Sequence, residues 1–126
     1  MSHAKGIAVT KFDSQLDRLR QLKDEGDWDG YGTPAPNETA LACASSVVTA
    51  MLERGLTPAK LIPSGVGGVA IYFQNGVNFA DFRCLNDGTM QGIISTDADF
   101  ELFDVTADSV YTAIDRIQNF IGGRQR

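Results

Sequence analysis

Apolar residues recur at helical spacing near the start of the chain. The stripe consists of Phe12, Leu16, Leu19 and Leu22. Because intervals of three or four residues lie on one face of a helix, the stripe predicts an amphipathic helix. Asp13 or Ser14 is a typical N-cap for it, and Gly26 is a typical end. Residues 1–11 lack this spacing, so we expect a flexible lead-in there, with Ile7–Val9 as a candidate strand.

A second stripe of the same kind follows Asn37. Its members are Leu41, Ala44, Val48, Met51 and Leu52. The stripe predicts a second helix over about residues 38–54, with Asn37 as its N-cap and Gly55 as the residue that ends it. Such a stripe is typical of a helix that packs on a core. Residues 57–63 contain two prolines and are interpreted as a connector.

The next part of the chain is rich in β-branched and aromatic residues and is divided by turn signals. Asn75-Gly76 is a strong hairpin signal, and Asn86-Asp87-Gly88 is a second tight turn. These turns separate three predicted antiparallel strands, which are Val69–Gln74, Val77–Leu85 and Thr89–Ser95. With Asn75-Gly76 at the centre of the first turn, Tyr72 faces Phe79 and Val69 faces Phe82.

The alternation of side chains assigns these strands two faces. One face, which we assign to the helices, collects Val69, Ile71, Phe73, Ala80, Phe82, Cys84, Met90 and Ile94. The other face collects Tyr72, Phe79, Asp81, Arg83, Gln91 and Ile93. Because this second face mixes aromatic and charged residues, it is either an apolar contact surface or a surface that the C-terminal segment covers.

The C-terminal part adds one more strand and one more helix. Phe100–Val105 is a candidate fourth strand, and Asp108 or Ser109 is a typical N-cap for a helix over about residues 110–121. Residues 122–126 are expected to be a flexible tail. The whole chain, residues 1–126, is therefore predicted to be a single α+β domain. It would contain two N-terminal helices, an antiparallel β-meander of three or four strands and a C-terminal helix packed on the sheet.

Charge is distributed unevenly along the chain. The net charge is −5, and residues 61–115 hold eight acidic residues against one base, Arg83. Because DNA and RNA require a positive surface, this part of the chain is expected to repel nucleic acid and to attract a basic protein. Asp97, Asp99 and Glu101 alternate, so they would lie on one side of an extended segment. We interpret them as an acidic edge that prevents pairing with other sheets, with a metal site as the alternative.

Few residues are suited to catalysis. The single histidine, His3, lies in the lead-in, and the two cysteines, Cys43 and Cys84, fall in a predicted helix and a predicted strand. Their apolar neighbours predict buried thiols, with a disulfide as the alternative. The sequence contains no recognisable nucleophile motif, so we predict a protein that is not an enzyme and uses no cofactor. Without an apolar run of about 18 residues or a secretion signal, we expect a cytoplasmic protein with no membrane contact.

The most unusual local composition is Trp28-Asp29-Gly30-Tyr31-Gly32, between the two predicted helices. Two glycines two residues apart predict positive φ, and Asp29 can accept hydrogen bonds from the backbone N–H groups that follow it. Trp28 and Tyr31 carry large amphipathic rings. We interpret the segment as a structural loop with Trp28 in the core.

A calcium loop is the alternative interpretation of the same segment. Counted from Asp27, the acids Asp29 and Glu38 stand at the third and twelfth positions of an EF-hand loop, and Gly32 at the sixth. Tyr31 occupies the fifth position, where an EF-hand has an oxygen ligand.

The same segment carries a family resemblance. Together with Pro34, Pro36, an alanine-rich helix and the glycine-rich strand start after Pro63, it resembles a family of small uncharacterised bacterial and phage proteins. That family shares a Trp-Asp-Gly-Tyr-Gly-Ala-x-Pro motif, and the resemblance covers about Trp28 to Ile94. Thr33 stands at the alanine of the motif, and Ser64–Gly68 lacks an acidic residue often seen there. The resemblance implies a compact fold and no particular activity.

These patterns favour a small acidic protein that binds another protein, such as an inhibitor, antitoxin or immunity-type protein of bacterial or phage origin. Its contact residues are expected to be Tyr72, Phe79, Asp81, Ile93, Asp97, Asp99 and Glu101. Acidic residues speed the capture of a basic partner, and aromatic residues supply affinity. Two alternatives remain, which are a metal-binding protein that uses the loop from Asp27 to Glu38 and a homodimeric structural or accessory protein.

Overall fold

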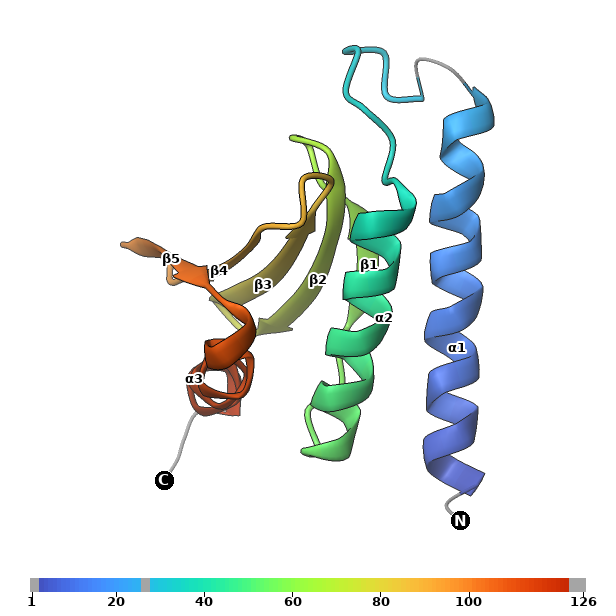
Figure 1. The fold of residues 1–126 in the computed structure, drawn as a ribbon. Helices are drawn as coiled ribbons and strands as arrows, with labels where there is room; N and C mark the ends of the chain where they lie inside the picture. The colour runs from blue at the N-terminus through green and yellow to red at the C-terminus, as the bar shows by residue number, and fades with distance from the viewer. Residues whose placement is uncertain (1–2, 26–27, 123–126) are drawn as a thin grey trace.

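The structure, a computed structural model, describes residues 3–25 and 28–122, with side chains from Lys11 onward. In chain order the elements are α1 (His3–Arg20), the 3₁₀ turn η1 (Gln21–Glu25), α2 (Glu38–Glu53), β1 (Lys60–Pro63), β2 (Gly68–Asn75), β3 (Asn78–Leu85), β4 (Met90–Ser95), β5 (Phe100–Val105), the 3₁₀ turn η2 (Ala107–Ser109) and α3 (Val110–Gly122). These residues form an α+β fold in which three helices pack on one antiparallel sheet (Figure 1). No helix in the described ranges is long and apolar enough to cross a membrane.

Helix α1 is longer than its apolar stripe suggests. It begins at His3, so the N-cap predicted at Asp13 or Ser14 and the strand predicted at Ile7–Val9 are both wrong. A helix that has nucleated gains one hydrogen bond for each residue that extends it, whereas two β-branched residues around an alanine form a strand only beside a partner strand. The helix tightens to 3₁₀ geometry at η1, and the end predicted at Gly26 lies outside the described residues.

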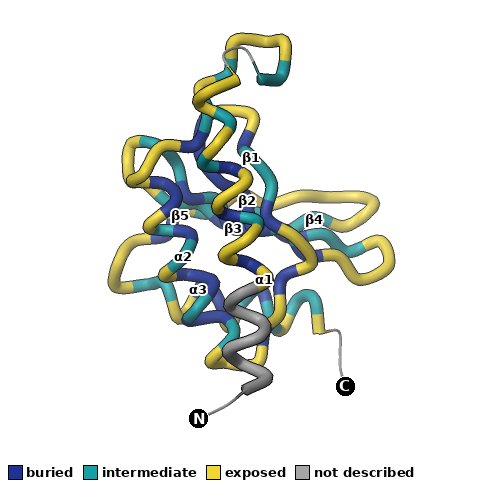
Figure 2. The backbone as a smooth tube through the Cα atoms, turned by 90° about the vertical axis from the view of Figure 1, so that its right-hand side faces the viewer, coloured by how far each residue is buried: buried dark blue, intermediate teal, exposed yellow. Residues whose placement is uncertain are grey.

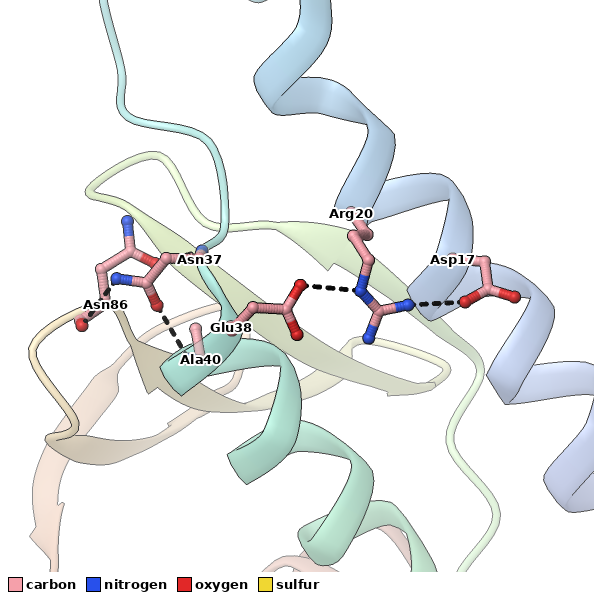
Figure 3. Close-up of polar contacts among 6 residues, drawn as sticks. All are labelled: Asp17, Arg20, Asn37, Glu38, Ala40 and Asn86. Carbon is pink, nitrogen blue, oxygen red and sulfur yellow. Dashed lines mark hydrogen bonds and ion pairs between the residues drawn. The ribbon is translucent and has the colours of Figure 1, made fainter.

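Helix α2 begins where the sequence predicts. The Asn37 side chain accepts a hydrogen bond from the Ala40 backbone N–H at 3.0 Å, which satisfies one of the free donors of the first turn. Asn86 lies in the turn between β3 and β4, and its side-chain oxygen accepts a hydrogen bond from the backbone N–H of Asn37 at 2.9 Å. Figure 3 shows Asn86 beside Asn37. The Asn86 side-chain amide also donates to the carbonyl of Ala35 at 3.0 Å. These bonds tie the start of α2 to one end of the sheet.

The sheet has five strands in the order β1-β2-β3-β4-β5, rather than the three or four predicted. The additional strand is β1, which the sequence analysis interpreted as a connector. It pairs antiparallel with β2, so that Lys60 stands beside Tyr72 and Leu61 beside Ile71. A four-residue strand that ends in proline carries little signal of its own, and only pairing with β2 reveals it.

The β2–β3 hairpin turns one residue later than predicted. Asn75 pairs with Asn78, which leaves Gly76 and Val77 as the central residues, and Gly76 has φ +62°. Each residue of β2 is therefore paired with a residue two positions further along β3 than expected. Because side chains alternate with a period of two, this shift leaves every side chain on its predicted face.

All three helices pack on the same face of the sheet, which we call the inner face (Figure 1). Its buried strand residues are Val69, Ile71, Phe73, Ala80, Phe82 and Cys84, and they join Phe12, Leu16 and Leu19 of α1, Leu41, Val48 and Met51 of α2, and Ala113, Ile114 and Ile117 of α3. The predicted inner face is thus confirmed. Burial of each large aliphatic or aromatic side chain contributes about 1.5–3 kcal/mol to folding, so this cluster is the main source of stability.

Gly92 of β4 marks the tightest packing of the inner face. A Cβ atom at this position would lie 2.3 Å from Cζ of Phe103, because the Phe103 ring lies across the glycine. The guanidinium carbon of Arg116, on α3, is 4.3 Å from the centroid of the same ring. The missing side chain of Gly92 therefore creates the space that lets β5 and α3 close the core.

Helix α3 begins at Val110, as predicted, but the 3₁₀ turn η2 precedes it, so the N-cap predicted at Asp108 or Ser109 is wrong. Thr106 is the N-cap, and its backbone N–H donates to the Ser109 hydroxyl at 2.9 Å. Helix α3 then runs to Gly122 with Ala113, Ile114 and Ile117 turned to the core. Because its apolar side faces the inner face, α3 leaves the other side of the sheet open.

Candidate protein-binding surface

The second face of the sheet is not covered by any element in the described ranges, and we call it the outer face. It is defined by the residues that alternate with the core, namely Lys60, Ile62, Ala70, Tyr72, Gln74, Phe79, Asp81, Arg83, Gln91, Ile93, Ser95, Phe100, Leu102 and Asp104. One row of this face crosses all five strands and contains Lys60, Tyr72, Asp81, Ile93 and Leu102. The structure thus brings together Tyr72, Phe79, Asp81 and Ile93, as the alternation predicts.

Apolar side chains form a band along the outer face. The rings of Tyr72 and Phe79 are tilted by 39° with their centroids 6.2 Å apart, and Ile93 is half-buried beside Asp81. Leu102 is 50% exposed and Phe100 is 72% exposed at the β5 end of the band. None of these side chains belongs to the core cluster, so their burial comes from one another and from the strands beneath.

Asp81 and Arg83 place charges in the middle of this band. Their Oδ1 and Nε atoms are 3.2 Å apart, but the geometry does not satisfy a hydrogen bond, and neither atom has another hydrogen-bond partner. Burial raises the pKa of the Asp81 carboxyl above its ordinary value, and the positive charge of Arg83 opposes that rise. The pair is an incompletely satisfied polar site within an apolar surface, a feature that a polar partner group could complete.

The three alternating acids are not brought together. Asp97 and Asp99 lie in the turn between β4 and β5, where the Thr96 hydroxyl accepts a hydrogen bond from the Asp99 backbone N–H at 3.1 Å. Glu101 is on the opposite side of β5 from the outer face and forms a 2.6 Å ion pair with Arg116. The prediction of one acidic side is therefore wrong, because a turn interrupts the alternation before β5 begins.

Several outer-face residues were not predicted to be part of this surface. Lys60 and Ile62 were missed because β1 was taken for a connector, and Phe100 and Leu102 because β5 was only a candidate strand. The signal was present in the alternation of Phe100, Leu102 and Asp104 with Glu101, Phe103 and Val105. The ring of Tyr72 also has the Lys60 ammonium 5.3 Å from its centroid, a contact that only the β1–β2 pairing creates.

The tryptophan loop folds on itself. Trp28 Nε1 donates to the Thr33 carbonyl at 3.0 Å, and Gly30 and Gly32 both have positive φ, +77° and +76°. Hydrogen bonds from the Thr33 side chain and from the Tyr31 backbone N–H lower the pKa of the Asp29 carboxyl. Trp28 is half-buried within the loop rather than in the core, and Tyr31 is 89% exposed. The loop projects beyond the helices at the top of Figures 1 and 2.

The residues of the suggested calcium loop are engaged elsewhere. The Asp29 carboxylate accepts a hydrogen bond from the Tyr31 backbone N–H within the loop. The Glu38 carboxylate accepts a 2.8 Å hydrogen bond from Nε of Arg20, and the same arginine donates to Asp17 through Nη1 (Figure 3). Asp27 lies outside the described residues. Within residues 3–25 and 28–122, no three His, Cys, Asp or Glu side chains are close enough to hold a metal ion.

The two cysteines meet between α2 and β3. Cys84 is fully buried, whereas Cys43 is half-buried at the edge of the core, and both are free thiols. Interaction with the Cys84 thiol lowers the pKa of Cys43, while the interaction with Cys43, reinforced by burial, raises the pKa of Cys84. The two thiols thus differ in accessibility and in ease of ionisation.

Comparison of the chain with protein-family models, with curated proteins and with solved structures finds no match.

Proposed function

We propose that the protein is a protein-binding module and that the outer face is its docking surface. The observation that supports this proposal is an apolar band, Tyr72, Phe79, Ile93, Phe100 and Leu102, on a sheet face that the helices leave open. Contiguous apolar surface with a polar rim is typical of protein contact sites, and large aromatic residues are common among the residues that contribute most to binding.

The charge of the molecule indicates the chemistry of the partner. The net charge is −5, and three exposed acids lie along the β4–β5 side of the sheet, with Asp97 and Asp99 in the β4–β5 turn and Asp104 toward the other end of β5. A basic protein would be steered to this side by long-range attraction, while the apolar band supplies the contact area. An inhibitor, antitoxin or immunity-type protein that captures a basic target fits this combination, and the resemblance to small bacterial and phage proteins is in keeping with it.

The proposal can be tested by comparing capture by two variants of the tagged protein. The face variant is Tyr72→Ala with Leu102→Ser, which removes two large side chains from the outer face. The control variant is Val66→Ala with Val77→Ala, which removes apolar atoms that are 67% and 58% exposed but lie in turns between strands rather than on the strands of this face. Proteins retained from a lysate of the source cells are identified by mass spectrometry, and circular dichroism checks that both variants are folded.

We expect a specific partner that binds the wild type and the control variant equally and the face variant at least about tenfold more weakly, as for loss of a central contact residue. The double reversal Asp97→Lys with Asp99→Lys should slow association at low salt and leave the dissociation rate nearly unchanged. Equal capture by all variants would refute the outer face as the docking surface. If size exclusion shows a dimer that the face variant disrupts and the control variant does not, the partner at the outer face is a second copy of the chain and not a basic target.

A further inference from the structure

A groove lies between α1 and β1. Its volume is about 550 Å³, and it is lined by Lys11, Ser14, Gln15, Arg18, Leu19, Lys60 and Leu61. The Gln15 side chain accepts a 2.8 Å hydrogen bond from the Leu61 backbone N–H, which ties the two walls together. This volume falls within the range of about 300–1,000 Å³ that is common for small-molecule sites.

Positive charges without acidic partners gather in this groove. Among the cationic side chains that the structure describes, Arg20, Arg54, Arg83 and Arg116 each form an ion pair with an acid. Lys11, Arg18, Lys23 and Lys60 form none, and three of these four line the groove. Although the net charge is −5, three of the four unpaired cations in the described part of the chain thus lie around one groove.

The arrangement of charge on α1 preserves this concentration. Asp13 and Asp17 lie on the other flank of the helix, where they line a separate groove facing α2, and Asp17 is held by Arg20 at 2.6 Å. Among the residues that the structure describes, no acidic side chain lines the groove between α1 and β1. The charges of Lys11, Arg18 and Lys60 are therefore not neutralised by a described carboxylate there, and a bound anion would neutralise them.

We propose that this groove binds a small molecule that carries a diphosphate or triphosphate group. Three cations match a polyvalent anion better than a single carboxylate. Arg18 can present a planar pair of N–H donors, Lys11 can supply a mobile ammonium group, and the Ser14 hydroxyl adds a donor. The Lys60 ammonium lies 5.3 Å from the centroid of the Tyr72 ring, so Lys60 contributes positive charge beside the groove. Leu19 and Leu61 provide an apolar floor for the organic part of the ligand. Lys60 also belongs to the outer face, whereas Lys11 and Arg18 belong to the groove alone.

The probes are inorganic pyrophosphate and ATP, with hexaglutamate as a carboxylate anion, titrated into the full-length protein by calorimetry at low and at physiological salt. The site variants are Lys11→Ala and Arg18→Ala. The matched control is Lys23→Ala, which removes an unpaired exposed cation of η1 that does not line the groove. Backbone amide NMR shifts locate the bound anion, and circular dichroism confirms that each variant is folded.

We expect saturable binding of pyrophosphate and ATP, with amide shifts in α1 and β1. Each site variant should weaken it about tenfold, as expected for loss of a charge-assisted hydrogen bond. Lys23→Ala should leave the affinity unchanged. The proposal is overturned by absence of saturable binding at millimolar pyrophosphate and ATP, by equal weakening in Lys23→Ala, or by hexaglutamate binding as tightly as ATP. Because none of these variants touches the apolar band, the result does not depend on whether the outer face binds a protein.

Discussion

The two faces of the sheet are built from the same strands and yet have different surroundings. On the inner face Val69, Ile71 and Phe82 are completely buried beneath the helices. On the outer face Tyr72 and Phe79, which alternate with them, are only half-buried and have no helix above them in the described ranges. Aromatic residues thus serve on one face as core and on the other as surface, so residue type alone does not distinguish the two roles.

The difference lies in how completely each face satisfies its own groups. The inner face is purely apolar in its strand centres, whereas the outer face holds the Asp81–Arg83 pair at 3.2 Å without a hydrogen bond. A closed protein core contains few buried polar atoms without hydrogen bonds, whereas a surface that becomes buried on binding can contain them in the free protein. This difference is in keeping with the docking role that we propose for the outer face.

The largest contrast in stability is expected between phenylalanine truncations on the two faces of β3, at Phe82 and at Phe79. Phe82→Ala on the inner face should lower the free energy of unfolding by about 3–5 kcal/mol, since it leaves a cavity in a closed core. Phe79→Ala on the outer face should lower it by about 1 kcal/mol or less, because water can fill the space. Urea denaturation followed by circular dichroism measures both. Similar losses would show that the outer face is part of the core.

Gly92 offers a test of how tightly the inner face is closed. Gly92→Ala should cost about 1–3 kcal/mol, because its Cβ would overlap the Phe103 ring that Arg116 holds in place. Gly65→Ala is the matched control, since a Cβ there meets nothing within 4 Å. Adding Phe103→Leu to Gly92→Ala should recover part of the loss if the overlap is its cause. A loss at Gly65 equal to that at Gly92 would remove this explanation.

Asp81 provides a pH-dependent contrast. Its pKa is raised in the folded state, so the folded protein takes up the proton more readily than the unfolded chain. Its contribution to stability therefore becomes more favourable as pH falls through the raised pKa toward the ordinary value of 3.8. The stability of the wild type relative to Asp81→Asn should rise across this window. Urea denaturation of both proteins from neutral to acidic pH measures the difference, and a constant difference would contradict the raised pKa.

The smallest expected effect on stability concerns the thiols at the inner face. Iodoacetamide should modify Cys43 in the folded protein and leave Cys84 unmodified until the protein unfolds, because Cys84 is buried and its pKa is raised. Mass spectrometry of the labelled protein measures the modification, and Cys43→Ser serves as the control that should remain unlabelled. Equal labelling of both residues would show that α2 separates readily from β3.

Local signals predicted much of the fold. Asn37 was identified as an N-cap because an asparagine before an apolar stripe is a short-range pattern, and the structure has that cap. The faces of β2, β3 and β4 were also correct, because they depend only on alternation and survive the two-residue shift in pairing. The N-terminal part of α1 was missed because it extends a helix beyond its apolar stripe. Strand β1 was missed because it forms only by pairing with β2.

The sequence by itself determined which residues share a face and where α2 begins, because periodicity and capping act over a few neighbouring residues. Only the tertiary structure decided that all three helices cover the same face, which leaves Tyr72 and Phe79 at the surface. It also placed Glu101 against Arg116, and Lys60 beside the cations of α1. These arrangements join residues far apart in the chain, so they follow from packing, which no local pattern encodes.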